Sequence, residues 1–250
     1  MIDYIIGNDN LLFTIPKDKE KFEIPEEENY WSFLKNSYED YINYFNKFFK
    51  EKDEEIKEKD FTIDCSNGTA AFCKDKIADL MSNNKSLKLS FINTDYQNYK
   101  ILNEGSGAEF VHKIKKFPSN FNSSIKENLA FDGDVDRIIF FLSLNNEFKM
   151  IDGDRQIVIN AMIINHFLTL LSPEIKEKFL KEISIGIATT AYANGAIISY
   201  IKKEFPNLNL VLGKTGVKFL QVKAFQYDIG IYFEANGHGT IHIAHFILIF

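Results

Sequence analysis

The sequence predicts an α/β protein made of two tandem α/β domains with mixed, largely parallel sheets, preceded by a helical N-terminal segment. Three observations lead to this prediction. The 250 residues are enough for two small domains, each with its own core. After about residue 60, short apolar segments alternate with segments of helical spacing, which is typical of parallel strands joined by helices. Polar turns directly follow several apolar segments, at the strand ends where ligands of such folds bind.

Charge and cysteine content exclude several classes of protein. The 29 Lys and Arg against 35 Asp and Glu give a formal net charge of −6, which argues against a general nucleic-acid-binding surface. Two cysteines, Cys65 and Cys73, and no apolar signal region near the start indicate a cytoplasmic protein without structural disulfides. The most apolar stretch, Ile241 to Phe250, is far shorter than the roughly 20 residues of a membrane-spanning helix. We interpret it as a core element and expect neither a nucleic-acid nor a membrane partner.

The first predicted element is an amphipathic helix from Asn29 to Lys50. Its apolar residues recur at spacings of three and four, which predicts a stripe that faces the core. The stripe consists of Tyr30, Leu34, Tyr38, Tyr41, Ile42, Phe45, Phe48 and Phe49. The mixed charge run from Lys50 to Asp60 predicts a solvated helix end or a linker.

The next segments predict the first α/β unit. A helix is expected from Ala70 to Met81, and Asn145-Asn146 is typical of a hairpin reversal between two strands. The strands are expected over residues 61–63, 87–92, 129–131, 137–144 and 148–151.

A second unit is predicted to begin at Asp152-Gly153-Asp154. We interpret this segment as a helix cap and hinge rather than a metal site, because it offers only two carboxylates. Ser172-Pro173 predicts the start of a further helix. The helices are expected over residues 155–171, from residue 172 onward, over 194–205 with a stop at Pro206, and over 217–225. Strands are expected over 183–189, 208–212 and 228–234, an order that favours a largely parallel sheet.

The strongest chemical signal is the acidic turn Asp132-Gly133-Asp134-Val135-Asp136 with the adjacent Arg137. Three carboxylates at alternate positions repel one another unless a cation joins them, and Mg²⁺ is favoured because it takes oxygen ligands and often a phosphate oxygen. Arg137 supplies a fork-shaped donor for a phosphate. A calcium EF-hand is excluded, since Arg137 stands where its glycine belongs and Ser143 where its bidentate Glu belongs. A solvated acidic hairpin remains the alternative.

The turn belongs to a larger pattern. The segment Asp132 to Arg137 resembles the magnesium loop of the α-D-phosphohexomutases, and Phe233 to Thr240 resembles their sugar-binding loop. Asn236 is typical of the branch that acts on N-acetylglucosamine phosphates, because other branches usually have Ser there. Supporting segments in the order of the family are Asp64-Cys65-Ser66-Asn67-Gly68, Thr190-Ala191-Tyr192-Ala193-Asn194-Gly195 and Lys214-Thr215-Gly216-Val217-Lys218. The resemblance covers about residues 60 to 240.

The resemblance implies four domains, of which this chain holds the second and most of the third. Residues 1–35 are expected to end a first domain, 36–151 to form the metal-binding domain, and 152–250 to form a sugar-binding domain truncated at its C-terminus. No Thr-x-Ser-His-Asn-Pro string carries the serine that is phosphorylated in the family, and no Arg-x-Ser-Gly-Thr phosphate loop occurs. The serines at plausible loop sites, none followed by His-Asn-Pro, are Ser66, Ser106, Ser123 and Ser124.

The implied activity is the interconversion of N-acetylglucosamine 6-phosphate and 1-phosphate on the route to UDP-N-acetylglucosamine. One Mg²⁺ would bind Asp132, Asp134 and Asp136, while glucose or N-acetylglucosamine 1,6-bisphosphate would act as activator. The implied sugar-phosphate contacts, besides Arg137, are Glu234, Asn236, His238, Lys214, Thr215, Gly216 and Val217. The chain alone is expected to be inactive, with a complementing chain as one source of the missing domains. The alternative function is a non-catalytic remnant or subunit that binds metal and sugar phosphate.

Some of these residues have plainer interpretations. Glu234 can be a solvated loop acid, and Lys214 to Val217 an ordinary strand-to-helix connection rather than an anion site. His238, His242 and His245 can be read as a metal cluster, but the carboxylate triad elsewhere favours core histidines for His242 and His245.

Overall fold

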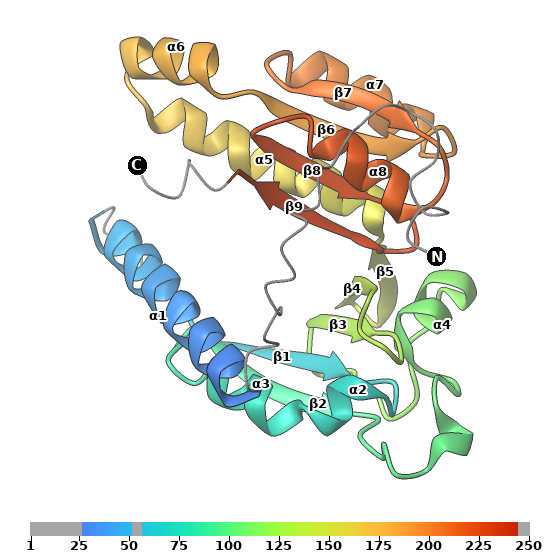
Figure 1. Cartoon of the computed structure of the whole chain (residues 1–250). Coiled ribbons are helices and arrows are strands. Elements are labelled where there is room, and N and C mark those ends of the chain that lie inside the picture. The colour runs from blue at the N-terminus through green and yellow to red at the C-terminus, as the bar shows by residue number, and fades with distance from the viewer. Residues whose placement is uncertain (1–26, 52–56, 245–250) are drawn as a thin grey trace, which may run out of the picture.

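The computed structural model describes residues 27–51 and 57–244, which form two α/β units, one above the other in Figure 1. The first unit holds a five-stranded sheet of order β2-β1-β3-β4-β5, and the second a four-stranded sheet of order β7-β6-β8-β9. Both sheets are mixed, and the predicted fold class is confirmed. No described helix has the length and apolar character needed to cross a bilayer.

The elements of the first unit are α1 (Glu27–Glu51), β1 (Lys59–Asp64), α2 (Thr69–Phe72), α3 (Lys74–Leu80), β2 (Leu87–Ile92), the 3-10 helix η1 (Tyr99–Ile101), α4 (Gly107–Ile114), β3 (Glu127–Phe131), β4 (Ile138–Leu144) and β5 (Glu147–Ile151). Those of the second unit are α5 (Gly153–Leu170), α6 (Pro173–Glu182), β6 (Ile185–Thr190), α7 (Gly195–Glu204), β7 (Asn209–Gly213), α8 (Val217–Ala224), β8 (Ile229–Phe233) and β9 (Gly239–Ile243).

The two sheets repeat one motif. In the first, β1 pairs in parallel with β2 and β3, and β3 pairs antiparallel with β4. In the second, β6 pairs in parallel with β7 and β8, and β8 pairs antiparallel with β9. The strand β5 is an addition to the first sheet, antiparallel to β4. The loop between β3 and β4 therefore holds the same position in its unit as the loop between β8 and β9.

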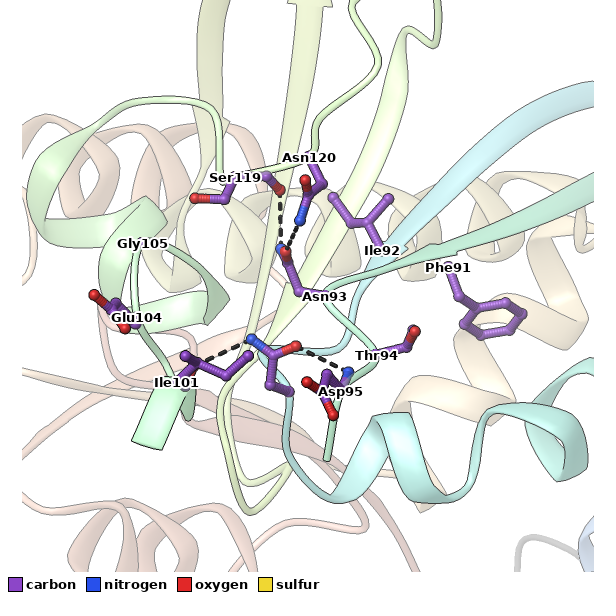
Figure 2. Close-up of a pocket in the computed structure, with 11 residues that line it drawn as sticks. Phe91, Ile92, Asn93, Thr94, Asp95, Ile101, Glu104, Gly105, Ser119 and Asn120 are labelled. Carbon is purple, nitrogen blue, oxygen red and sulfur yellow. Dashed lines mark hydrogen bonds between the residues drawn. The ribbon is translucent and has the colours of Figure 1, made fainter. Parts of the chain in front are cut away.

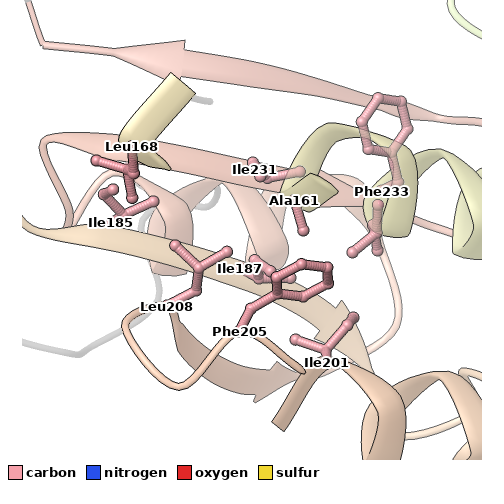
Figure 3. Close-up of a cluster of buried hydrophobic side chains, with 10 residues drawn as sticks. Ala161, Leu168, Ile185, Ile187, Ile201, Phe205, Leu208, Ile231 and Phe233 are labelled. Carbon is pink, nitrogen blue, oxygen red and sulfur yellow. The ribbon is translucent and has the colours of Figure 1, made fainter. Parts of the chain in front are cut away.

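Each unit buries its own apolar core. In the second unit, Ile187 and Ile231 from the sheet pack against Ala161 of α5 and Ile201 of α7, as Figure 3 shows. In the first unit, Ile63 and other side chains pack with α2 and α3, while a separate cluster that includes Ile139 and Phe141 packs with α4. Burial of each large apolar side chain contributes roughly 1.5–3 kcal/mol, so these clusters stabilise the frame that carries the loops.

Most predicted elements are confirmed. Strand and helix bounds lie within two residues of the prediction, apart from the helix discussed next. The predicted caps are also found, since Asp152 accepts a hydrogen bond from the Arg155 amide and Ser172 from the Ile175 amide. Asn145 and Asn146 have positive φ angles of 54° and 62° in the hairpin between β4 and β5, as the reversal required.

Two predicted elements were wrong in part. The expected helix from Ala70 to Met81 is broken at Cys73 into α2 and α3. The C-terminal apolar stretch was expected in the core, but its described part lies in β9, an edge strand in which Ile241 and Ile243 are 37% and 44% exposed. Residues 245–250, including His245, lie outside the described residues. The helix α4 was not predicted, and it begins at Gly107, whose φ is +86°.

The apolar stripe of the first helix was also interpreted incorrectly. Ile42 is buried, but Tyr30 and Tyr41 are 52% and 59% exposed. The helix lies beside α3, where Lys35 contacts Asp79 at 2.9 Å, and it does not cover the sheet with its described part. Spacing predicts which residues share a helix face, but the surface that meets that face depends on tertiary packing. The side chains of Phe45, Phe48 and Phe49 lie outside the described residues.

A buried carboxylate holds the loops of the first unit together. Asp64, at the end of β1, is fully buried and accepts hydrogen bonds from Ser66 N (3.0 Å), Asn93 Nδ2 (2.8 Å) and Gly107 N (2.7 Å). Burial raises the pKa of Asp64, and the three donors act in the opposite direction. Asp64 thus ties the ends of β1 and β2 to the start of α4.

Replacing Asp64 tests this framework. Asp64→Ala leaves three buried donors without their acceptor, so we expect the free energy of unfolding to fall by about 3 kcal/mol or more in urea denaturation. The matched control is Asp60→Ala in the same strand. Asp60 is exposed, and its ion pair joins Oδ1 to Nζ of the exposed Lys88 at 3.6 Å, which is a weak surface interaction. The control should change stability by less than about 1 kcal/mol. Equal effects of both substitutions would contradict the role of Asp64.

Candidate functional site

The acidic loop between β3 and β4 brings three carboxylates together. Asp132, Asp134 and Asp136 each offer one oxygen, and these oxygens lie within 4.8 Å of one another. Asp132 is buried, whereas Asp134 and Asp136 are exposed. Between them Val135 adopts a left-handed φ of +65°, which is uncommon for a β-branched residue and turns the chain sharply. Within the described part of the chain, this is the only grouping of three or more potential metal ligands.

Asp132 anchors this loop. Its Oδ1 accepts hydrogen bonds from the amides of Asp136 (3.1 Å) and Arg137 (3.2 Å), while its Oδ2 lies 3.4 Å from Arg137 Nε. Burial raises the pKa of Asp132, and the neighbouring carboxyl of Asp136 raises it further. The loop therefore holds negative charges at close range, an arrangement that a cation stabilises.

The donor set fits a hard divalent cation. Three carboxylates on one short loop are the ligands that Mg²⁺ takes in proteins, usually together with water or phosphate oxygens. Arg137 is the adjacent cationic group in the sequence, and its Nε also lies 3.6 Å from Asp136 Oδ1. No described atom accepts a hydrogen bond from this Nε. A single guanidinium leaves the loop with net negative charge, so the residues present suit the ion that the acidic turn predicted.

The sugar-binding-type loop from Glu234 to His238 joins β8 to β9. The Glu234 amide donates to the His238 carbonyl at 2.8 Å, and the Gly237 amide donates to the Glu234 carbonyl at 3.0 Å. Asn236 Oδ1 accepts from the His238 amide at 3.1 Å. These hydrogen bonds close a tight turn. They fix the positions of Glu234, Asn236 and His238 relative to one another.

A third loop joins this one through Glu234. Its Oε1 accepts a hydrogen bond from the Gly216 amide at 2.8 Å, which brings the loop that precedes α8 against the sugar-binding-type loop. Gly216 has a φ of +115°, a conformation that favours glycine. Its amide is therefore used within the protein, and Lys214 and Thr215 are the exposed groups of this loop. Lys214 Nζ lies 6.0 Å from the centre of the Phe219 ring.

The acidic loop and the sugar-binding-type loop are joined directly. Arg137 and His238, each the last residue before the fourth strand of its motif, form an antiparallel β-bridge. The Ile138 amide donates to the Gly237 carbonyl at 3.2 Å, and His238 Nε2 lies 3.6 Å from Asp136 Oδ2. A Cβ on Gly237 would lie 2.1 Å from the Ile138 carbonyl oxygen, so glycine is required for this approach. The predicted metal ligands and sugar contacts thus lie on two touching loops.

The start of α5 also contacts the sugar-binding-type loop. The sequence analysis did not predict this contact. The Gly153 amide donates to the Ala235 carbonyl at 3.1 Å, and a Cβ there would meet the Glu234 carbonyl oxygen at 1.8 Å. Asp154 is buried, which raises its pKa, and it accepts a hydrogen bond from the Asn194 amide at 3.0 Å. Asp152-Gly153-Asp154 is therefore a cap that also positions two loops. The only sequence signal was the glycine between the two acids.

Two cavities lie near the carboxyl ends of β1 and β2, and the smaller of the two reaches the acidic loop. The first, of about 680 Å³, is lined by residues at and after the carboxyl ends of β1 and β2, as Figure 2 shows. Its lining includes Asn67, Asn93, Asp95 and Glu104. The side-chain amide of Asn67 donates a hydrogen bond to the Ile101 carbonyl and accepts one from the Asp95 backbone amide. A smaller cavity of about 290 Å³ is lined partly by Asn67 and Gly133 and reaches the acidic loop.

His242 is only partly buried on the edge strand β9, so its interpretation as a core histidine was wrong, whereas the two cysteines are free thiols as expected. His242 stacks on Phe225 at a centroid distance of 4.1 Å and is not grouped with the potential metal ligands. Cys65 and Cys73 are not joined in a disulfide, and burial raises the pKa of Cys65 to about 12. A raised pKa disfavours the thiolate form that a reactive cysteine requires, so Cys65 is a structural residue.

Comparison with known proteins agrees with this geometry. Residues 152–248 match the family model described as phosphoacetylglucosamine mutase AMG1, domain III. The phosphoacetylglucosamine mutase of Candida albicans is 34% identical over 221 residues, which cover 87% of this chain and 38% of that protein. The human protein of the same name is 38% identical over 180 residues, covering 71% of this chain and 31% of its own length.

Solved structures show the same relationship. The Aspergillus fumigatus N-acetylphosphoglucosamine mutase in complex with GlcNAc-6P and magnesium superposes with a TM-score of 0.73 and 30% identity. The superposition covers 92% of this chain and 43% of that one. An apo-form N-acetylglucosamine-phosphate mutase, described as a member of the alpha-D-phosphohexomutase superfamily, superposes with a TM-score of 0.70 and 32% identity, covering 86% of this chain and 43% of the other. By sequence and fold, the chain is similar to the phosphoacetylglucosamine mutases over most of its own length, and it spans about a third of the length of its curated relatives.

Proposed function

We propose that this chain is the metal- and sugar-binding part of a phosphoacetylglucosamine mutase, which interconverts N-acetylglucosamine 6-phosphate and 1-phosphate. The observation that carries the proposal is the bridge between Arg137 and His238, because it unites a carboxylate triad with a sugar-binding-type loop. A phosphoryl-transfer site needs a cation close to the place where the sugar phosphate binds. The A. fumigatus relative was crystallised with both GlcNAc-6P and magnesium, which supports the same ligands here.

Asp132, Asp134 and Asp136 would hold one Mg²⁺. When bound, the ion offsets the negative charge of the transferring phosphoryl group. Arg137 lies against two of these carboxylates and offers its remaining guanidinium donors to a phosphate oxygen. The protein's own contribution is to keep the carboxylates at one point, which Asp132 does through its two backbone hydrogen bonds.

Glu234, Asn236 and His238 would bind the sugar. One oxygen of Glu234 holds the Gly216 amide, and the other remains for a sugar hydroxyl. Lys214 and Thr215, both exposed at the neighbouring loop, would face the phosphate, while Gly216 and Val217 shape that loop from the backbone. A carboxylate and an amide bind sugar hydroxyls well when the backbone that carries them is rigid. Glu234 and Asn236 meet this condition, because both lie in a hydrogen-bonded turn.

The domain organisation is part of the proposal. Residues 1–35 would end a first domain, 36–151 would form the metal-binding domain and 152–250 the sugar-binding domain, a division supported by the family model matched at 152–248. The phosphorylated serine and the C-terminal phosphate loop would come from further domains, in the same protein or in a complementing chain. We propose glucose or N-acetylglucosamine 1,6-bisphosphate as activator and the cytoplasm as location. A variant of the A. fumigatus relative was solved in complex with glucose 1,6-bisphosphate, which supports the choice of activator.

The metal assignment predicts a loss of Mg²⁺ affinity in Asp134→Asn. Removing one of three anionic ligands should weaken binding by roughly tenfold or more, measured by isothermal titration calorimetry. The matched control is Asp75→Asn, which makes the same change at an exposed acid in α3. Unchanged affinity in Asp134→Asn, or equal losses in both variants, would remove this loop from the assignment.

The sugar assignment predicts a preference for N-acetylglucosamine 6-phosphate over glucose 6-phosphate. Saturation-transfer NMR with Mg²⁺ present should show stronger transfer to the acetylated sugar. Asn236→Ser should reduce that preference, since Ser still accepts the His238 amide but shortens the side chain that meets the sugar. Equal binding of the two sugars to the wild-type chain would contradict the proposed branch.

The isolated chain should show no mutase turnover. No serine in it lies in a loop that matches the family's phosphorylated serine, and loss of a covalent nucleophile leaves only binding and electrostatic effects. The assay combines the chain with Mg²⁺, glucose 1,6-bisphosphate and N-acetylglucosamine 6-phosphate and follows 1-phosphate formation against Asp132→Ala. Sustained turnover above that control would show that another residue replaces the serine. Activity that appears on adding separately expressed first and fourth domains would support a complementing chain.

A further inference from the structure

We propose that the metal loop and the sugar loop are energetically coupled, so that a divalent cation at Asp132, Asp134 and Asp136 strengthens sugar-phosphate binding at Glu234 to His238, with His238 as the positioning residue that transmits the effect. The inference rests on the proposed function, because it concerns the same two ligands. Beyond the proposed function, it states how binding of the cation changes the affinity for the sugar phosphate.

The path of coupling is short and continuous. Asp136 is one of the three carboxylates of the metal loop, and its Oδ2 lies 3.6 Å from His238 Nε2. The next residue, Arg137, pairs through its backbone with His238, and the residue after that donates its amide to the Gly237 carbonyl. A cation that repositions Asp136 therefore acts on a segment already bonded to the sugar loop.

Inside the sugar loop, His238 reaches both proposed sugar contacts. Its carbonyl accepts from the Glu234 amide at 2.8 Å, and its amide donates to Asn236 Oδ1 at 3.1 Å. A shift of His238 is thus felt at Glu234 and at Asn236 together. The two loops are closely packed where they meet, since a Cβ on Gly237 would lie only 2.1 Å from the Ile138 carbonyl oxygen. A close-packed contact of this kind transmits small displacements.

Thermodynamic linkage requires that the effects of the two ligands on each other's affinity be equal. If the cation tightens sugar-phosphate binding by some factor, the sugar phosphate must tighten cation binding by the same factor. A rival cause is the direct attraction between the cation and the phosphate, which does not pass through the His238 side chain. The two causes separate in a variant that lacks only this side chain.

The test uses the whole 250-residue chain. Calorimetry or ligand-detected NMR measures the dissociation constant of N-acetylglucosamine 6-phosphate with and without saturating MgCl₂, in wild type, His238→Ala and His242→Ala. The control His242 lies in β9, the strand that directly follows His238, and stacks on Phe225 instead of contacting Asp136. We expect Mg²⁺ to lower the constant about fivefold or more in wild type and in His242→Ala, and by less than about twofold in His238→Ala.

A second measurement uses MgCl₂ alone. Hydrogen exchange of the Glu234, Gly237 and His238 amides should slow on adding Mg²⁺ to the wild type and should not respond in His238→Ala. This readout needs no sugar, so it remains informative if sugar binding in the variant is weak. Circular dichroism establishes that the variant is folded.

The outcomes separate this inference from the proposed function. Absence of Mg²⁺ or sugar-phosphate binding in the wild type would overturn the proposed function and the coupling with it. Binding of both ligands with no mutual effect, or an undiminished effect in His238→Ala, would overturn the coupling through His238 and leave the proposed function standing.

Discussion

The antiparallel bridge between Arg137 and His238 is the contact on which the candidate site depends. It joins the loop that carries the acidic triad to the loop that carries Glu234 and Asn236, although 101 positions separate the two residues in the sequence. The bridge is possible because both loops occupy the same place in two copies of one strand order. Because the two loops meet, the residues proposed to bind the cation and those proposed to bind the sugar are neighbours.

Buried carboxylates keep the surrounding loops in place. Asp64, Asp132 and Asp154 lie at or next to the ends of strands and helices, and burial raises the pKa of each. Each also accepts hydrogen bonds from backbone amides of loops that have no regular secondary structure of their own. Burying a carboxylate is costly unless such donors are supplied, so each acid and its loop stabilise one another. Asp134 and Asp136, the acids proposed to bind the cation together with Asp132, are exposed instead.

Much of this arrangement could be predicted from local sequence. Apolar runs ended by turn residues were enough to predict the strands, and the alternation of Asp132, Asp134 and Asp136 was enough to predict that their carboxylates meet. Capping by Asp152 and Ser172 also follows from residue type and position. In each case the partners lie within a few residues of one another, so chain geometry alone brings them together.

The remainder depends on contacts between distant segments. Nothing near Glu234 in the sequence indicates that its carboxylate would hold the Gly216 amide, or that His238 would lie against Asp136. The exposure of Tyr30 and Tyr41 has the same origin, because helical spacing does not tell which surface a helix will meet. The break at Cys73 and the edge position of β9 likewise reflect how neighbouring elements pack.

The central claim is that the cation site on the acidic loop of the first unit lies directly beside the sugar-binding-type loop of the second unit. Paramagnetic broadening of backbone amide signals by substoichiometric Mn²⁺ tests it most directly, because the effect falls steeply with distance from the ion. The structure predicts early broadening of residues 133–138 together with Gly237 and His238 of the second unit. Broadening confined to the first unit, or spread over exposed acids such as Asp75 and Glu177, would contradict this placement.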